Sequence, residues 1–263
     1  MLARKAFFSF TGINDPTKHR DYNEWHQLDH RPENLALPGV VWGERWVHSP
    51  DCAALATNSG TAVDATQYIN LYWYREPFEE SIKEWQDLAE IAFQWGRRPD
   101  VAWTTRPLMG FFSVIKGYAN PRVLVSADVL PFRPTRGVYV TLTQLLEPHH
   151  PDTDALHAWY DRERIPQIVD LPGVAGAWTF ASDSTTLDPR WQSTPGSVTF
   201  DPIEGPDRGT FRVHVYFLDG DPLDVAKGIA ALPARDNIHT ERTLFAGPLR
   251  TIIPWQWDWF DGA

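Results

Sequence analysis

Apolar and polar positions along the first part of the chain follow the order strand, helix, strand, strand, helix, strand. Short segments that are apolar, or that alternate apolar with polar residues, are expected to be strands. Longer segments with apolar residues three or four positions apart are expected to be helices. The expected strands are residues 6–13, 40–48, 67–75 and 107–115, and the expected helices are residues 15–37 and 77–97.

Local signals mark where these elements begin and end. Asp15 is an expected N-cap, with Pro16 at the first helical position. Pro32 removes a backbone N–H inside the same helix, which predicts a kink or break near Arg31. The small polar residues of 49–66 predict a loop.

The second part of the chain repeats this order. The expected strands are residues 137–146, 174–181, 210–218 and 244–254, and the expected helices are residues 153–170 and 222–232. Residues 183–209 are rich in Pro, Gly, Ser and Asp, which predicts an insertion. Residues 119–136 contain three prolines and are expected to link the two parts.

The two parts also share a sequence. Residues 22–46 read YNEWHQLDHRPENLALPGVVWGERW, and residues 156–180 read LHAWYDRERIPQIVDLPGVAGAWTF. At an offset of 134, Trp25 meets Trp159, Pro32 meets Pro166, and both copies contain Leu-Pro-Gly-Val. Such a repeat indicates two units of one architecture.

The order of elements in each unit is the ferredoxin-like β-α-β-β-α-β motif. Its sheet has helices on one face only, so the other face must be buried against another layer. The predicted fold class is therefore α+β, with two ferredoxin-like repeats forming an intrachain α+β barrel. We expect residues 1–118 to form the first repeat, 119–136 the linker and 137–263 the second repeat.

Composition narrows the range of partners and compartments. The formal net charge is −10 with no basic run, which excludes nucleic acid as an expected partner. No segment approaches the roughly 20 apolar residues of a membrane span, and the N-terminal apolar run is too short for a signal peptide. The single cysteine, Cys52, cannot form an internal disulfide. We therefore expect a cytoplasmic protein that does not bind membranes.

Differences between the two copies indicate where chemistry lies. His26 and His30 align with Tyr160 and Arg164, and Arg45 aligns with Thr179. Two histidines four residues apart share one helix face and suit general acid–base catalysis. We expect His30 to be the principal acid–base group, with His26 assisting, and Arg45 to bind a carboxylate or phenolate. Alternatively, His30 bonds backbone groups freed by the proline, and His26 faces solvent.

Alternation along the third strand of each half indicates two different faces. In residues 67–75, Tyr68, Asn70, Tyr72 and Tyr74 share one face, while Ile69, Leu71 and Trp73 share the other. The polar faces are expected to border cavities, and a solvated sheet face is the alternative. The expected substrate-binding residues are Tyr72, Tyr74, Asn70 and Trp42 in the first half and Tyr160, Arg164 and His214 in the second.

The motif made by Trp25, His30, Pro32, Leu37-Pro38-Gly39-Val40 and Arg45 resembles the EthD-like branch of the dimeric α+β barrel superfamily. The resemblance covers both halves, so the chain looks like a tandem fusion of a unit that usually dimerises. Relatives in this superfamily include aromatic polyketide cyclases and decarboxylases, muconolactone isomerases, cofactor-free monooxygenases and haem-degrading enzymes. The resemblance thus implies a fold and leaves several functions open.

Taken together, these features predict a cofactor-independent lyase of decarboxylase type, or an isomerase or cyclase, acting on a small aromatic or phenolic acid. No cofactor or metal is expected, because no third ligand accompanies His26 and His30 at a suitable spacing. Nucleotide-binding and serine-hydrolase motifs are absent from the sequence. The alternatives are a non-catalytic binding protein and a haem- or oxygen-using monooxygenase. The protein is expected to be a monomer or a homodimer.

Overall fold

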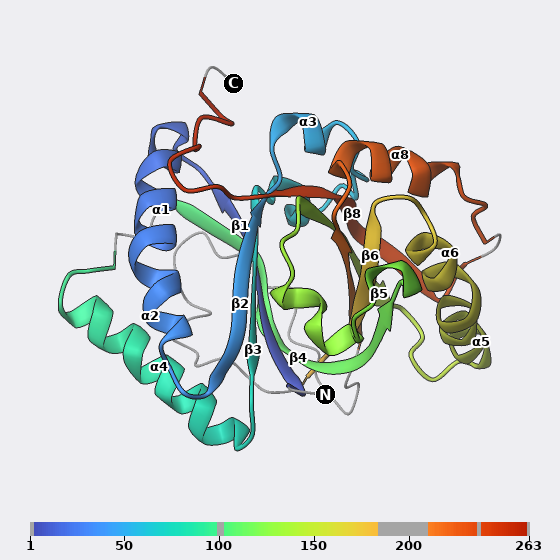
Figure 1. The fold of residues 1–263 in the computed structure, drawn as a ribbon, viewed down its shortest axis with the longest axis horizontal. Coiled ribbons are helices and arrows are strands. Elements are labelled where there is room, and N and C mark those ends of the chain that lie inside the picture. Colours follow the sequence, from blue (N-terminus) through green and yellow to red (C-terminus); the bar gives the residue numbers. More distant parts are fainter. Residues whose placement is uncertain (1–2, 99–102, 184–209, 236–237, 262–263) are drawn as a thin grey trace.

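Eight antiparallel strands form one closed barrel in the computed structural model, which describes residues 3–98, 103–183, 210–235 and 238–261 (Figure 1). The strands follow the order β1-β3-β2-β8-β5-β7-β6-β4 around the barrel. Their bounds are β1 (Lys5–Ile13), β2 (Val40–Val47), β3 (Tyr68–Tyr74), β4 (Thr104–Ala119), β5 (Gly137–Leu145), β6 (Val174–Ser182), β7 (Phe211–Leu218) and β8 (Glu241–Thr251). This confirms the predicted α+β barrel. The expected insertion lies, from residue 184 on, outside the described residues.

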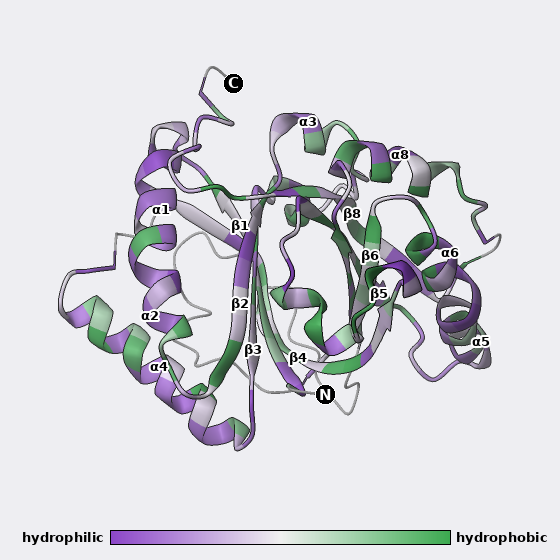
Figure 2. Cartoon of the chain, viewed as in Figure 1, coloured by the Kyte–Doolittle hydropathy of each residue, from purple (hydrophilic) through white to green (hydrophobic). Residues whose placement is uncertain are grey.

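Helices cover the outside of the barrel in two groups, one for each half of the chain (Figure 1). The first group is α1 (His19–Trp25), η2 (His26–His30), α2 (Arg31–Leu35) and α4 (Phe78–Gln94). The second group is α5 (Pro151–Trp159), η6 (Tyr160–Arg164), α6 (Ile165–Val169) and α8 (Pro222–Ala231). Figure 2 shows that α4 and α5 mix hydrophilic and hydrophobic residues along their length, as helices with one covered face do.

The two halves of the barrel have the same strand order and unequal junctions. The first half runs β4-β1-β3-β2 and the second β8-β5-β7-β6. At one junction, β4 pairs with β6 from Phe112–Ser182 to Ala119–Gly176. At the other, β2 and β8 share only Trp46–Thr251 and Val47–Arg250. The barrel is therefore closed mainly along the β4–β6 junction.

The barrel interior is a dry aromatic and aliphatic core to which both halves contribute. Ring pairs cross between the halves, with centroids 5.0 Å apart for Phe8–Phe180 and 5.3 Å apart for Trp73–Trp178. Trp42, Trp46 and Trp73 belong to this core or pack against it. Burying these large rings contributes much of the stabilisation that holds the halves together.

The first long helix contains an irregular turn where a kink or break was predicted, and it continues beyond that turn. Residues 26–30 form a π turn, in which the backbone N–H of Arg31 donates to the carbonyl of His26, five residues back. The helix then continues into α2, with Pro32 in its first turn. Ile165 and Tyr160 make the same bond in the second half, ahead of Pro166. The wider π turn accommodates the proline. In a regular α-helix the proline would lack the N–H of one hydrogen bond, and its ring would clash with the preceding turn.

Three smaller expectations also change. The predicted loop 49–66 contains α3 (Pro50–Ala53) and η3 (Ala62–Ala65). The linker contains two 3-10 turns, η4 (Pro121–Val123) and η5 (Ala127–Phe132). η1 (Pro16–Lys18) precedes α1, and the Asp15 side chain caps it by accepting the N–H of Thr17, as predicted. None of the described helices is long and apolar enough to cross a membrane.

Candidate active site

A small cavity lies between the outer face of the first-half sheet and the helices that cover it. Its volume is about 40 Å³, which is room for a few water molecules. Strands β1, β3 and β4 form its floor, and α1, η2 and α4 form its walls. It is lined by Phe7, Ser9, Tyr22, Trp25, His26, His30, Asn70, Tyr72, Trp85, Arg98, Arg106 and Met109.

The π turn brings both histidines to this cavity. His26 is its first residue and His30 its last, and their ring centroids lie 5.0 Å apart in an edge-to-face contact. His30 stacks on Trp25 with centroids 4.6 Å apart. The structure therefore places His26 away from solvent, with 3% of its surface exposed.

His26 has the free acid–base atom of the pair. Its Nδ1 is buried and has no hydrogen-bond partner among the described residues. Burial lowers the pKa of His26 well below its ordinary value, and the nearby Arg45 and His30 lower it further. The imidazole is thus neutral at neutral pH and can accept a proton.

His30 is held on both sides by other side chains. Its Nδ1 lies 3.5 Å from Oε1 of Glu33, and the Asn34 amide lies 3.2 Å from its Nε2. This arrangement fits a neutral ring that carries its proton on Nδ1 and accepts from the amide at Nε2. Burial lowers the pKa of His30, and the Glu33 carboxylate opposes that shift. Of the two rings, His26 thus has a buried nitrogen without a partner among the described residues, while both nitrogens of His30 face other side chains.

Arginines surround the cavity, and no acidic residue is among the described residues that line it. Arg106 comes from β4, and Arg98 follows α4. Burial and the neighbouring Arg106 lower the pKa of Arg98 to about 10. The cavity is thus a positively charged site in a chain of net charge −10.

Arg45 lies behind this site rather than in its wall. It is fully buried between the rings of Tyr22 and Tyr68, at 4.9 and 4.8 Å from their centroids. One guanidinium nitrogen, Nη1, donates to Oδ1 of Asn23 at 2.9 Å, while Nε and Nη2 have no hydrogen-bond partner in the described part of the chain. Its positive charge still affects the site, because it lowers the pKa of His26. Arg45 is therefore absent from the cavity wall, which instead contains Arg98 and Arg106.

The other expected first-half residues divide between the two sheet faces. Asn70 and Tyr72 line the cavity, as their alternation along β3 predicts. Tyr74 shares their face and lies further along it, fully buried against Trp85 and Phe111. Trp42 lies on the opposite face, where its ring contacts Trp73 in the barrel interior. The structure therefore separates Tyr74 and Trp42 from the cavity.

The expected second-half residues also gather between sheet and helices. Tyr160 donates to Oε1 of Glu241 at 2.6 Å, and its ring centroid lies 5.0 Å from that of His214. Burial, then Arg212 and His157, lower the pKa of His214 to about 3. Arg164 instead donates to the carbonyl of Pro233.

The carboxyl of Glu241 distinguishes the second-half cluster from the first. Glu241 pairs with Leu145 on β5 as Thr104 pairs with Ile13 on β1, so the first half has a threonine at that position. A buried acid beside Arg212 offsets the positive charge there. Among the described residues, no acidic side chain lines the first cavity.

Sequence reasoning missed Arg98, Arg106 and Trp85 as cavity residues. Arg98 follows a long helix, where basic residues are common and mostly solvated. Arg106 stands on a strand between Thr105 and Pro107, where alternation alone could have assigned it to the outer face. Their convergence depends on how α4 packs across the sheet.

Known proteins resemble this chain in structure and not in sequence. No family model matches the chain, and no curated protein matches its sequence. A solved structure named as a candidate chlorite dismutase superposes with a TM-score of 0.50 at 12% identity, over 99% of this chain and 98% of its own. An anthrone oxidase-like protein superposes with a TM-score of 0.50 at 10% identity, over 96% and 92%.

The chain has the α+β barrel fold of these proteins. The predicted α+β barrel is thus confirmed as a fold. At such low identity the likeness says nothing of the reaction, so function is argued from the cavity.

Proposed function

We propose that the first-half cavity binds the carboxylate or phenolate of a small organic acid and that His26 moves a proton on it without a cofactor. One observation carries the proposal. Two histidines and two arginines line a half-enclosed cavity that has no acid in its described wall, and a third arginine lies behind it. Cations brought together away from water repel each other, and an anionic ligand offsets that cost.

The resting state of His26 favours one class of reaction over another. A neutral imidazole begins as a base, so it can take a proton from carbon or oxygen and return it elsewhere on the same substrate. Isomerisation and cyclisation need only this transfer. Decarboxylation needs a proton delivered to the carbon that loses carbon dioxide, which His26 can supply after taking the phenolic proton of the substrate. Isomerisation and cyclisation therefore need fewer steps than decarboxylation.

Substrate binding also changes the basicity of His26. Burial lowers its pKa, and the charge of Arg45 lowers it further because it disfavours a second cation nearby. A bound anion opposes that effect and raises the pKa toward its ordinary value. Proton transfer is thereby coupled to the presence of a charged ligand.

An aromatic ring fits only if the cavity enlarges. A dry cavity of about 150 Å³ holds benzene, whereas this one measures about 40 Å³. The flat rings of Trp25, Trp85 and Tyr72 supply walls on which an aromatic ligand can stack. We therefore expect binding to be accompanied by movement of cavity side chains.

Ligand pairs matched in shape test the charge preference. Benzoate and salicylate are expected to raise the melting temperature, and benzamide and benzyl alcohol are not. Arg106→Met should remove the effect of the anions, whereas Arg242→Met, at an exposed arginine on β8, should leave it unchanged. Equal stabilisation by the neutral compounds, or no loss in the Arg106 variant, would contradict anion binding.

Catalysis is separated from binding by a second variant. His26→Gln should still bind the anion and lose at least about a hundredfold in turnover, the usual contribution of general acid–base catalysis. A protein that binds anions and forms no product from any of them on prolonged incubation is instead the non-catalytic binding protein of the alternative hypothesis.

Haem does not fit this cavity. Ligand sites for molecules of drug size or larger measure about 300–1,000 Å³, far above the space between these helices and the sheet. Both nitrogens of His30 also face other side chains. We derive no step through haem, and a Soret band in the purified protein would overturn this conclusion.

We also propose that the chain belongs to the EthD-like branch and arose by tandem duplication. The shared π turn before Pro32 and Pro166 supports this relationship, because an uncommon backbone feature recurs at the same place in both copies. On this view residues 1–118 and 137–263 are two units joined by the linker.

A further inference from the structure

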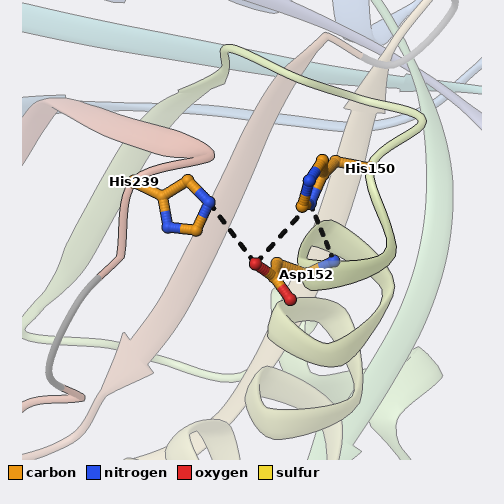
Figure 3. A group of neighbouring side chains, drawn as sticks. All are labelled: His150, Asp152 and His239. Carbon is orange, nitrogen blue, oxygen red and sulfur yellow. Dashed lines mark hydrogen bonds and ion pairs between the residues drawn. The ribbon is translucent and has the colours of Figure 1, made fainter.

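Two histidines and an aspartate meet at the start of α5, on the second half of the molecule (Figure 3). His150 is the N-cap of α5, Asp152 lies in its first turn, and His239 lies in the segment before β8. Oδ2 of Asp152 lies 3.6 Å from Nδ1 of His150 and 3.4 Å from Nε2 of His239. One ligand atom from each side chain lies within 4.8 Å of the other two.

We propose that His150, Asp152 and His239 bind a divalent first-row transition metal ion. In a tetrahedral site with metal–ligand bonds of about 2.0–2.1 Å, neighbouring ligand atoms are roughly 3.3–3.4 Å apart. The two distances to Asp152 are close to that edge length and longer than a normal hydrogen bond. The two histidine ligand atoms lie within 4.8 Å of each other, so a rotation of one ring is needed to reach this edge length.

The ligand set selects the class of metal. Imidazole nitrogens suit zinc, cobalt, nickel, copper and iron, whereas calcium and magnesium require oxygen ligands. Three protein ligands leave at least one position to water. The site is thus expected to prefer zinc or cobalt over magnesium.

The lone pair that a metal needs is present on His150. Its Nδ1 accepts the backbone N–H of Asp152 at 3.1 Å, so this nitrogen carries no proton in that arrangement. A bound cation would replace the amide hydrogen as the partner of this lone pair. Figure 3 shows the His150 and His239 rings on either side of the Asp152 carboxylate.

The cluster joins two segments that are far apart in sequence and already adjacent in space. The N–H of Leu146 donates to the carbonyl of Thr240 at 2.7 Å, and Arg235 donates to the carbonyl of Ala155. A metal ion would add a third link between the start of α5 and the entry to β8. Glu241, the partner of Tyr160, follows His239 by two residues. We therefore expect bound metal to stabilise this edge of the second half.

Titration of the full chain with Co²⁺ and Zn²⁺, after treatment with a chelator, tests the site. We expect one Co²⁺ per chain with visible d–d absorption, displaced by Zn²⁺ and unaffected by excess Mg²⁺. Asp152→Asn and His239→Gln should each weaken affinity by at least about tenfold. His149→Gln removes an exposed neighbouring histidine and should leave affinity unchanged, while circular dichroism confirms that each variant is folded.

Two results would overturn the proposal. One is Co²⁺ binding that Asp152→Asn and His239→Gln leave intact, which would place the metal elsewhere. The other is equal weakening by His149→Gln, which would show general attraction to surface histidines. A rise in melting temperature with Zn²⁺ in the wild type and in His149→Gln, and in neither ligand variant, supports the role of the ion as a link.

Discussion

At the scale of single residues, the candidate site combines two arginines in its wall with a third, Arg45, buried behind it. Arg45 has its charge buried between two tyrosine rings with one hydrogen bond, to Asn23. Burial lowers the pKa of Arg45, while the surrounding tyrosines and Glu44 oppose that shift. Burial lowers the pKa of His26, and the charge of Arg45 lowers it further.

Replacing Arg45 with methionine is therefore expected to raise the pKa of His26. Removing a nearby positive charge makes the protonated imidazole less unfavourable. The acidic limb of any pH–rate profile should move to higher pH by the same amount. Titration of the His26 ring by NMR, with His26→Gln to assign the signal, measures this directly. An unchanged pKa would mean that burial alone sets it.

At the scale of elements, the π turn η2 positions the chemistry. It places His26 and His30 at its two ends and admits Pro32 without breaking the helix. The strand β2 beneath it supports Tyr72 closely, since a Cβ added at Gly43 would lie 2.2 Å from Cδ1 of that ring. Position 43 thus has no room for a side chain while the ring of Tyr72, a cavity residue, stays in place.

Gly43→Ala is expected to lower the free energy of unfolding by about 1–3 kcal/mol, because the tyrosine ring must shift in a packed layer. It should also weaken ligand binding in the cavity. Gly110→Ala is the matched control, since nothing lies within 4 Å of the Cβ that it adds on β4. Chemical denaturation of both variants measures the difference, and equal effects would contradict the proposed contact.

At the scale of the whole molecule, one barrel interior joins two halves with different outer sites. The first half keeps a positive cavity, while Glu241 balances Arg212 in the second. The C-terminal segment crosses back to the first half, where Phe260 stacks on His19 with centroids 4.1 Å apart. The halves are therefore linked both inside and outside the barrel.

Stability of the whole chain should fall as the pH drops below about 6.5. Burial lowers the pKa of His214 to about 3 and that of His19 to about 4. Above about pH 6.5 each of these histidines is neutral in both the folded and the unfolded state. Below that pH the histidine binds a proton in the unfolded state and stays neutral in the folded state, which favours unfolding. Each such histidine contributes up to about 1.4 kcal/mol of lost stability per pH unit.

Melting temperatures between pH 7.5 and 4.5 at constant ionic strength test this dependence. His214→Gln removes one contributing group, so its curve should be flatter than that of the wild type. A wild-type melting temperature that does not change across this range would contradict the assignment of neutral buried histidines.

The sequence by itself determined the order of the elements, the internal repeat and the α+β barrel. It also determined which side chains of β3 share a face, since alternation along a strand is a local property. Each of these depends on neighbours a few residues apart or on similarity between two segments. Position along the strand grouped Asn70 with Tyr72, and both line the cavity.

Only the tertiary structure decided which of those side chains share a site. It brought Arg98 and Arg106 to His26, moved Arg45 behind the cavity, and sent Trp42 to the opposite face of the sheet. It also assembled His150, Asp152 and His239 from two distant segments. Whether such side chains come together depends on how helices pack across a sheet and on the register of strands far apart in sequence. No local sequence pattern encodes either of these.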